Sequence, residues 1–172
     1  MELAKHQVNE LVVYGSSGVY RIEEICKKQV GKTNAEYYVL KPVYERGGST
    51  VYVPIGSEQL EGKLRPLLSK EEVVRLIDSL PTMQVPWIEN QDARRARYKE
   101  IPHDGDRTAM IRAVRALHLK RREQQAAGKR LYLVDEHFLK DAERLLYDEF
   151  AAALDMEPKQ VLPYILEQLQ IS

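Results

Sequence analysis

The chain has 172 residues, of which 44% are hydrophobic and 30% are charged, and its formal net charge at pH 7 is zero. This composition is typical of a globular protein with one large or two small domains. The apolar runs fall well short of the roughly 20 residues that span a bilayer. A single cysteine, Cys26, excludes a disulfide framework and a cysteine-based zinc site. Without a signal-like apolar run at its start, the chain is expected to be cytoplasmic.

The first 68 residues are expected to form strands, because short apolar runs alternate there with turns rich in Gly and Pro. The expected strands are Val8–Tyr14, Val19–Lys27, Glu36–Tyr44, Thr50–Ile55 and, until Pro66 ends it, Gly62–Leu68. Pro42 and Pro54 lack amide donors, so each should lie at a sheet edge or a strand end. The turn Arg46–Ser49 contains two glycines. The short and regular spacing of the expected strands indicates a small, strongly bent antiparallel barrel.

After residue 68 the apolar period becomes helical. Ser69 and Glu72 have the spacing of a capping box. Further helices are expected at about Asn90–Ile101, after the N-cap Asp106, near Asp135 and after Pro158. The inward positions are expected to include Met110, Ile111, Val114 and Leu117, and later Val161, Leu162, Ile165, Leu166 and Leu169. We therefore expect an α+β fold made of two segregated domains. The first is a β-barrel over residues 1–68, and the second is an all-α bundle of about five helices over residues 69–172.

No constellation of side chains indicates catalysis. Gly31-Lys32-Thr33 lacks the preceding glycine of a phosphate-binding loop, and the segment from Gly56 to Lys63 has the wrong spacing. The four histidines do not show metal-ligand spacing. Asp135 and Glu136 stand at a helix start, where acids complement the helix dipole. We expect a protein that is not an enzyme and that needs no metal or cofactor.

Positive charge gathers in one part of the helical half. Residues 93–130, called here the basic belt, contain twelve Lys or Arg and four Asp or Glu, a net charge of +8. The rest of the chain therefore carries −8. Such a belt is either a solvated helix face or a surface that meets a polyanion such as nucleic acid. It crosses two expected helices and their loop, and Arg112 and Arg115 lie about one turn apart.

Trp87 is the only tryptophan and precedes the basic belt in the loop Val85-Pro86-Trp87. One interpretation is a partly buried tryptophan that packs on the core. The other is an apolar wedge beside basic side chains, as in proteins that open base steps from the minor groove. The residues alone leave both interpretations open.

The order of several motifs resembles the CarD-type bacterial transcription regulators, also called CdnL-like. The motifs are VVYGSSGVYRIEEI over Val12–Ile25, EYYVLK over Glu36–Lys41, TVYVP over Thr50–Pro54, then Trp87, Arg97-Tyr98-Lys99, Gly105-Asp106 and Lys140–Ala153. The N-terminal part of that family is shared with transcription-repair coupling factor. The resemblance implies a Tudor-like or SH3-like barrel that binds the β subunit of RNA polymerase. It also implies a helical domain that touches promoter DNA at the upstream edge of the bubble.

The resemblance also implies residues for each role, and with them a nucleoid-associated location. The implied polymerase-binding residues are Lys28, Tyr38, Lys41, Arg46 and Tyr52. The expected DNA-binding residues combine Trp87 and the arginine cluster of the resemblance with further cations of the basic belt: Trp87, Arg94, Arg95, Arg97, Lys99, Arg112, Arg115, Arg122, Lys129 and Arg130. Either Glu36–Tyr44 or Thr50–Ile55 would be the edge strand that pairs with the polymerase. A tryptophan wedge in the minor groove would stabilise the open complex.

Two departures from the family pattern bear on these roles. Lys28 and Tyr52 stand where relatives tend to carry arginines. The segment Ile88–Ala93 separates Trp87 from the arginine cluster, and its acids oppose phosphate. The resemblance favours the wedge role for Trp87, with a loop anchor as the alternative.

Two other functions compete with transcription regulation through DNA. In one, the chain is an adaptor on RNA polymerase whose helical domain binds another protein and not DNA. In the other, the barrel binds RNA by stacking bases on its tyrosines: Tyr14, Tyr20, Tyr37, Tyr38, Tyr44 and Tyr52. Strand alternation would bury about half of these tyrosines, which disfavours the RNA function.

Overall fold

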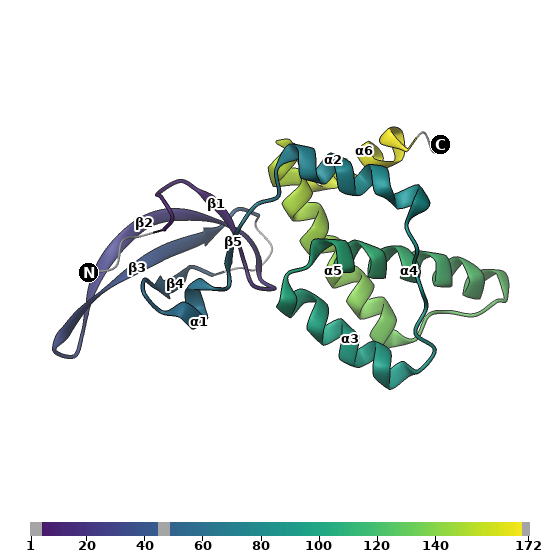
Figure 1. The fold of residues 1–172 in the computed structure, drawn as a ribbon, viewed down its shortest axis with the longest axis horizontal. Coiled ribbons are helices and arrows are strands. Elements are labelled where there is room, and N and C mark those ends of the chain that lie inside the picture. Colours follow the sequence, from purple (N-terminus) through teal and green to yellow (C-terminus); the bar gives the residue numbers. More distant parts are fainter. Residues whose placement is uncertain (1–4, 45–48, 170–172) are drawn as a thin grey trace. The chain divides into compact units, whose positions relative to one another are not determined.

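The computed structural model describes residues 5–44 and 49–169, apart from the side chains of Val30 and Thr33 (Figure 1). The chain divides into two compact units, Met1–Leu67 and Leu68–Ser172, and each is described by itself. The expected turn at Arg46–Ser49 lies mostly outside the described residues. None of the described helices is long and apolar enough to cross a membrane.

The first unit is built on a five-stranded antiparallel sheet with the strand order β4-β3-β2-β1-β5. Its elements are β1 (Leu11–Tyr14), β2 (Gly18–Val30), β3 (Thr33–Pro42), β4 (Val51–Pro54), a short helix α1 (Glu58–Glu61) and β5 (Leu64–Pro66). Pro42, Pro54 and Pro66 are each the last residue of a strand, as residues without an amide donor should be. The sheet agrees with the expected Tudor-like fold.

β4 and β5 are the edges of this sheet, whereas β3 pairs with β2 on one side and β4 on the other. Of the two candidate edge segments, Thr50–Ile55 lies at an edge as β4, whereas Glu36–Tyr44 lies inside the sheet as β3. β2 and β3 are also longer than their apolar runs suggested. Gly31 turns one into the other at a φ of 64°, a conformation that glycine adopts without a Cβ clash.

Alternation along the strands places one set of side chains in the interior of the sheet unit. The buried cluster consists of Val12, Tyr20, Ile22, Tyr38, Leu40, Val53 and Leu64. A register shift between Ile22 and Glu24 marks a bulge in β2. Bulges bend a strand and increase its twist, so this one helps the long hairpin to curve.

The second unit contains the five helices that the period predicts: α2 (Lys70–Ser79), α3 (Gln91–Asp104), α4 (Arg107–Ala126), α5 (Leu133–Leu154) and α6 (Val161–Gln168). Two 3₁₀ turns, η1 (Leu80–Thr82) and η2 (Pro158–Gln160), precede α3 and α6. The capping box is confirmed, because the Ser69 hydroxyl accepts from the Glu72 amide and the Glu72 carboxylate accepts from the Ser69 amide, both at 3.1 Å. Asp106 is the N-cap of α4, and its carboxylate accepts a hydrogen bond from the Ala109 amide at 3.0 Å.

Helix α5 is the centre of this unit and packs against each of α2, α3, α4 and α6 (Figure 1). The predicted inward residues Met110, Ile111, Val114 and Leu117 of α4 are all buried. In α6 only part of the predicted face is buried: Val161 and Ile165 are interior, while Leu162 and Leu166 are exposed. Pro163 lies in the first turn of α6, where a missing amide donor costs no intrahelical hydrogen bond.

Candidate functional site

Trp87 lies in the loop between η1 and α3 and is half-buried. Its ring contacts cations from two helices. The guanidinium carbon of Arg94 is 4.5 Å from the ring centroid, and the Nζ of Lys120 in α4 is 5.3 Å from it. Cations over an indole face are attracted by its ring quadrupole. Both helices therefore help to fix the orientation of the tryptophan.

A buried ion pair between Arg94 of α3 and Asp135 of α5 supports the loop that carries Trp87. Arg94 donates through Nε and Nη2 to the two carboxylate oxygens of Asp135, at 3.1 and 2.9 Å. Its Nη1 donates to the backbone oxygens of Ile88 and Glu89, at 3.1 and 3.0 Å. The Tyr98 hydroxyl donates to Asp135 at 2.6 Å. Arg94 is 3% exposed and Asp135 is 1% exposed.

This geometry corrects the role that the sequence gave to Arg94. A guanidinium that is buried, bidentate to a carboxylate and bonded to two carbonyls is not on the surface that phosphates would meet. Its hydrogen bond to Asp135 raises the pKa of Arg94, so the charge is retained. Arg94 instead positions the backbone immediately after Trp87.

Tyr98, which lies beside this ion pair, makes the free energy of unfolding depend on pH in the alkaline range. Burial raises the pKa of Tyr98, and its hydrogen bond to Asp135 raises it further. Burial likewise raises the pKa of Tyr147 to about 12. An unfolded chain loses these protons at about pH 10. The folded state holds them more tightly, so this stability is present below about pH 10 and is lost as the pH rises through the raised pKa values.

We therefore expect Tyr98→Phe to flatten the alkaline loss of stability. The measurement is the free energy of urea unfolding at about pH 9 and about pH 11 for the native chain and the variant. Tyr147→Phe is the matched comparison and should remove a separate part of the slope. An unchanged pH slope in Tyr98→Phe would contradict the hydrogen-bonded, buried state of the phenol.

The predicted DNA-binding residues of the basic belt differ in their burial and in their contacts. Arg97 and Arg112 line a cavity of about 210 Å³ together with Trp87. Arg95, Lys99, Arg122, Lys129 and Arg130 are exposed, as is Arg112. Arg115 is half-buried, and its Nε has no hydrogen-bond partner among the described residues. Arg97 also pairs with Glu100 at 3.2 Å. The structure thus brings Arg97 and Arg112 to the tryptophan.

The segment between Trp87 and α3 is built as a helix start. The Asn90 side chain accepts from the Ala93 amide at 2.9 Å, which satisfies one of the free donors of α3. Glu89 and Asp92 are exposed. Their carboxylates face solvent beside the belt, and they reduce its local positive charge.

On the sheet unit, two of the predicted polymerase-binding residues meet. The Nζ of Lys28 in β2 lies 3.6 Å from the ring centroid of Tyr52 in β4, and both side chains are exposed. Lys41 in β3 is also exposed. Arg46 lies outside the described residues. The structure therefore brings Lys28 and Tyr52 together at the edge strand β4, and it leaves Lys41 accessible.

Tyr38 is a correction, because it is fully buried in the sheet core. Its hydroxyl accepts hydrogen bonds from the backbone amides of Lys5 and His6, at 2.8 and 3.1 Å. The side chain of Tyr38 therefore holds the segment before β1 and is not available to a partner. The pleat explains this, since Tyr38 faces the opposite side of the strand from its neighbours Tyr37 and Val39.

Comparison with known families assigns the sheet unit. Residues 6–68 match the family model described as the CarD-like/TRCF RID domain. Residues 6–68 form a CarD-like domain. Such a domain interacts with RNA polymerase, so the chain is related to transcription. A search of the curated proteins finds no match.

The family match ends within one residue of the end of the sheet unit and does not extend into helices α2 to α6. The family match therefore assigns no function to the helical unit. In the described part of the chain, no group of three or more His, Cys, Asp or Glu is placed to hold a metal ion.

Sequence reasoning missed the residue that organises the helical site. Asp135 was interpreted as an acid that complements a helix dipole, but it is the buried partner of Arg94, 41 positions away. A helix start is a frequent place for an acid, so the local pattern gave no signal. The only hint was the apolar setting of Asp135, between Leu133, Val134 and Phe138.

Proposed function

We propose that this protein is a transcription regulator in which the CarD-like domain binds the β subunit of RNA polymerase and the helical unit contacts promoter DNA to stabilise the open complex. One observation carries the proposal. An RNA polymerase-interacting domain is joined to a helical unit that holds a half-buried tryptophan beside Arg97 and Arg112. A fixed aromatic ring among cations is suited to a nucleic-acid partner.

The polymerase contact is proposed at the β4 edge. On its other side β4 pairs with no strand among the described residues. The Ile55 amide bonds to the Glu36 oxygen, so alternation directs the amides of Val53 and Val51 toward β3 as well. The amide and carbonyl of Tyr52 then face outward, where an added strand would pair with them.

Tyr52→Pro tests this edge. Proline removes the outward amide of Tyr52 without removing a β3–β4 ladder bond, so we expect binding of the full chain to RNA polymerase to weaken by about tenfold or more. Calorimetric titration of the polymerase gives the affinity. Tyr52→Ala is the matched control, since it keeps the amide and loses only the ring. Equal affinities for Tyr52→Pro and the native chain would exclude the β4 edge.

The DNA contact is proposed for the surface around Trp87. Arg97 and Arg112 line the cavity beside the ring, and Arg95 and Lys99 are exposed cations of the same helix as Arg97. Arg94 is excluded because it is buried. Arg115, Arg122, Lys129 and Arg130 remain predicted DNA-binding residues. Lys129 and Arg130 follow the end of α4, about 20 Å along that helix from Arg112. They would reach DNA only over a longer stretch of duplex.

The chain would act by binding the open complex more tightly than the closed one. Its zero net charge predicts weak binding to free DNA, so recruitment through the polymerase would supply most of the local concentration. The test is the lifetime of open complexes, challenged with heparin, with and without the protein. A longer lifetime supports the proposal. An unchanged lifetime, in a protein that still binds the polymerase, would contradict it.

A further inference from the structure

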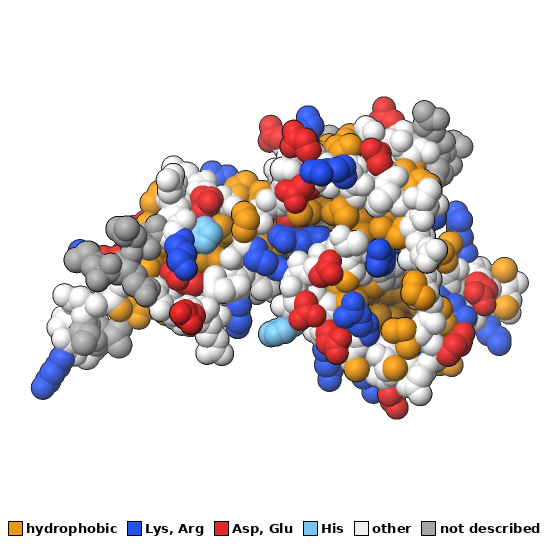
Figure 2. Space-filling view, in the orientation of Figure 1, with side chains coloured by type: hydrophobic (Ala, Val, Ile, Leu, Met, Phe, Trp, Pro, Cys, Tyr) orange, Lys and Arg blue, Asp and Glu red, His pale blue; other side chains and the backbone are white. Residues whose placement is uncertain are grey.

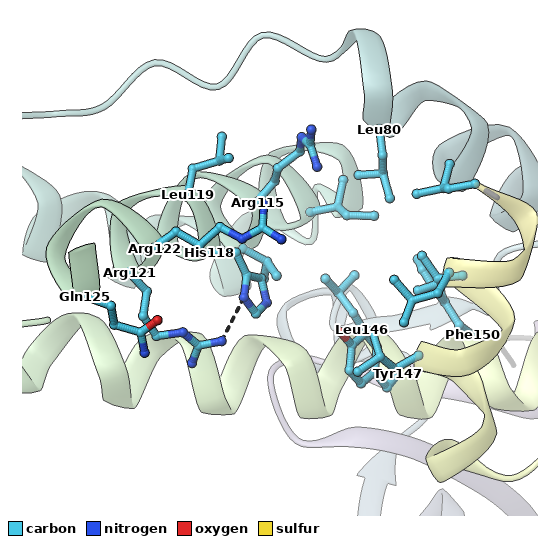
Figure 3. Close-up of a pocket in the computed structure, with 16 residues that line it drawn as sticks. Leu80, Arg115, His118, Leu119, Arg121, Arg122, Gln125, Leu146, Tyr147 and Phe150 are labelled. Atoms are coloured by element: carbon cyan, nitrogen blue, oxygen red, sulfur yellow. Dashed lines mark hydrogen bonds between the residues drawn. The ribbon is translucent and has the colours of Figure 1, made fainter. Parts of the chain in front are cut away.

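A second surface of the helical unit does not include Trp87, although two residues that line it, Arg115 and Arg122, are also predicted DNA-binding residues. It is a groove of about 590 Å³ between the end of α2, α4, α5 and α6 (Figure 3). Figure 3 shows Arg115, His118 and Arg122 on the α4 wall and Leu146, Tyr147 and Phe150 on the α5 wall opposite. We call it the α4–α6 groove.

The α4–α6 groove is mainly apolar, and part of that apolar surface is open. Leu119, Leu162 and Leu166 line it and are 41%, 47% and 37% exposed. Hydrophobic side chains are visible at the surface in the hollow between the α2 and α4 segments (Figure 2). Scattered exposed leucines are ordinary, but leucines gathered on one concave surface are typical of a binding site.

The charged side chains of the α4–α6 groove all have one sign. Arg115, Arg121 and Arg122 line it, and none of the described residues that line it is Asp or Glu. His118 is engaged on both ring nitrogens, with Arg121 at 2.9 Å and with Glu143 at 2.7 Å. The Nε of Arg115 has no hydrogen-bond partner within the described part of the chain. An occupant would therefore need apolar anchors and acidic flanks.

We propose that the α4–α6 groove binds an amphipathic helix of a partner protein, with leucine-like side chains against α5 and α6 and with Asp or Glu facing Arg115 and Arg122. Helices that enter apolar grooves present residues at i, i+3, i+4 and i+7, and charge complementarity sets their orientation. Duplex DNA satisfies the arginines but leaves the leucines without a partner. This inference goes beyond the proposed function and does not depend on it.

The test uses the full chain and a fluorescein-labelled, 16-residue helical peptide with Leu at i, i+3, i+4 and i+7 and Glu beside them. Two matched peptides replace every Glu by Lys, or scramble the order at constant composition. We expect saturable anisotropy with the acidic peptide alone. Leu162→Glu should weaken binding at least tenfold and Arg122→Glu at least fivefold. Lys140→Glu, an exposed cation of α5 outside the groove, should change it less than twofold.

Because Leu162 is exposed, its substitution should leave the fold intact, and circular dichroism checks this. Absence of binding, or equal binding of the Lys or scrambled peptide, would overturn the proposal. Displacement of the peptide by a 20-base-pair duplex, with the same loss of duplex binding in Leu162→Glu, would assign the groove to DNA. Self-association of the chain that Leu162→Glu abolishes would assign it to a second copy, which also overturns the proposal.

Discussion

Replacing Trp87 by alanine is expected to shorten the lifetime of the open complex about tenfold, while the affinity for RNA polymerase changes less than twofold. The expected size follows from stacking of an aromatic side chain on a base, which is worth about 1–3 kcal/mol. Polymerase affinity should survive because the CarD-like domain, residues 6–68, does not include the tryptophan. The measurement is the decay of heparin-challenged complexes at a saturating concentration of the variant.

The same variant separates the wedge from the loop anchor. If Trp87 is a wedge, Trp87→Ala loses complex lifetime and Trp87→Phe, which keeps an aromatic ring, loses less. If Trp87 only anchors its loop through Arg94 and Lys120, alanine should lower the free energy of unfolding and leave the lifetime unchanged. The cation contacts themselves are worth about 0.5–1 kcal/mol at exposed sites. A lifetime that follows stability alone would contradict the wedge.

The elements that the sequence predicted well are those with local signals. Ser69 and Glu72 marked the start of α2, and Asp106 that of α4, because caps are made by residues three apart. Strand ends were predictable where Pro42, Pro54 and Pro66 remove an amide donor. The order of an antiparallel sheet followed by a helical bundle was predictable because the spacing of apolar residues changes from a strand period to a helical period after residue 68.

The features that the sequence did not predict depend on contacts between distant residues. Which strand lies at the edge follows from pairing across the whole sheet, so the sequence left Glu36–Tyr44 and Thr50–Ile55 as alternatives. Leu162 and Leu166 have a helical apolar spacing whether or not another helix covers them. Local pattern gives the period of a face but not its partner.

Buried acids are the clearest example. Asp135 was interpreted as an acid that complements a helix dipole, and Glu149 had no predicted role, yet each is at most 4% exposed. Glu149 receives two hydrogen bonds from Arg107, at 3.1 and 3.0 Å, and one from the Leu68 amide at 2.9 Å. A buried charge needs its partner in three dimensions, and sequence separation of about 40 residues or more hides that partner.

Arg94→Met is expected to lower the free energy of unfolding of the helical unit by about 3–5 kcal/mol, the cost of leaving a buried charge without its partner. The variant leaves the Asp135 carboxylate in the interior with the Tyr98 hydroxyl as its remaining side-chain donor. Urea unfolding followed by tryptophan fluorescence reports on this unit, because Trp87 is the only tryptophan of the chain. Asp135→Leu should lower the free energy of unfolding by a similar amount, because it leaves the buried guanidinium of Arg94 without its carboxylate partner.

The pair Arg97–Glu100, on the same helix α3, supplies the control. Its side chains are 42% and 61% exposed, so Arg97→Met should change stability by less than about 1 kcal/mol. The double variant of Arg94 and Asp135 should cost less than the sum of the single variants, because it leaves no unpaired charge. Additive losses would show that the two side chains do not act as a pair. If the Arg94–Asp135 pair also positions the Trp87 loop, the double variant should still fold. It should nevertheless shorten the lifetime of the open complex, as Trp87→Ala does.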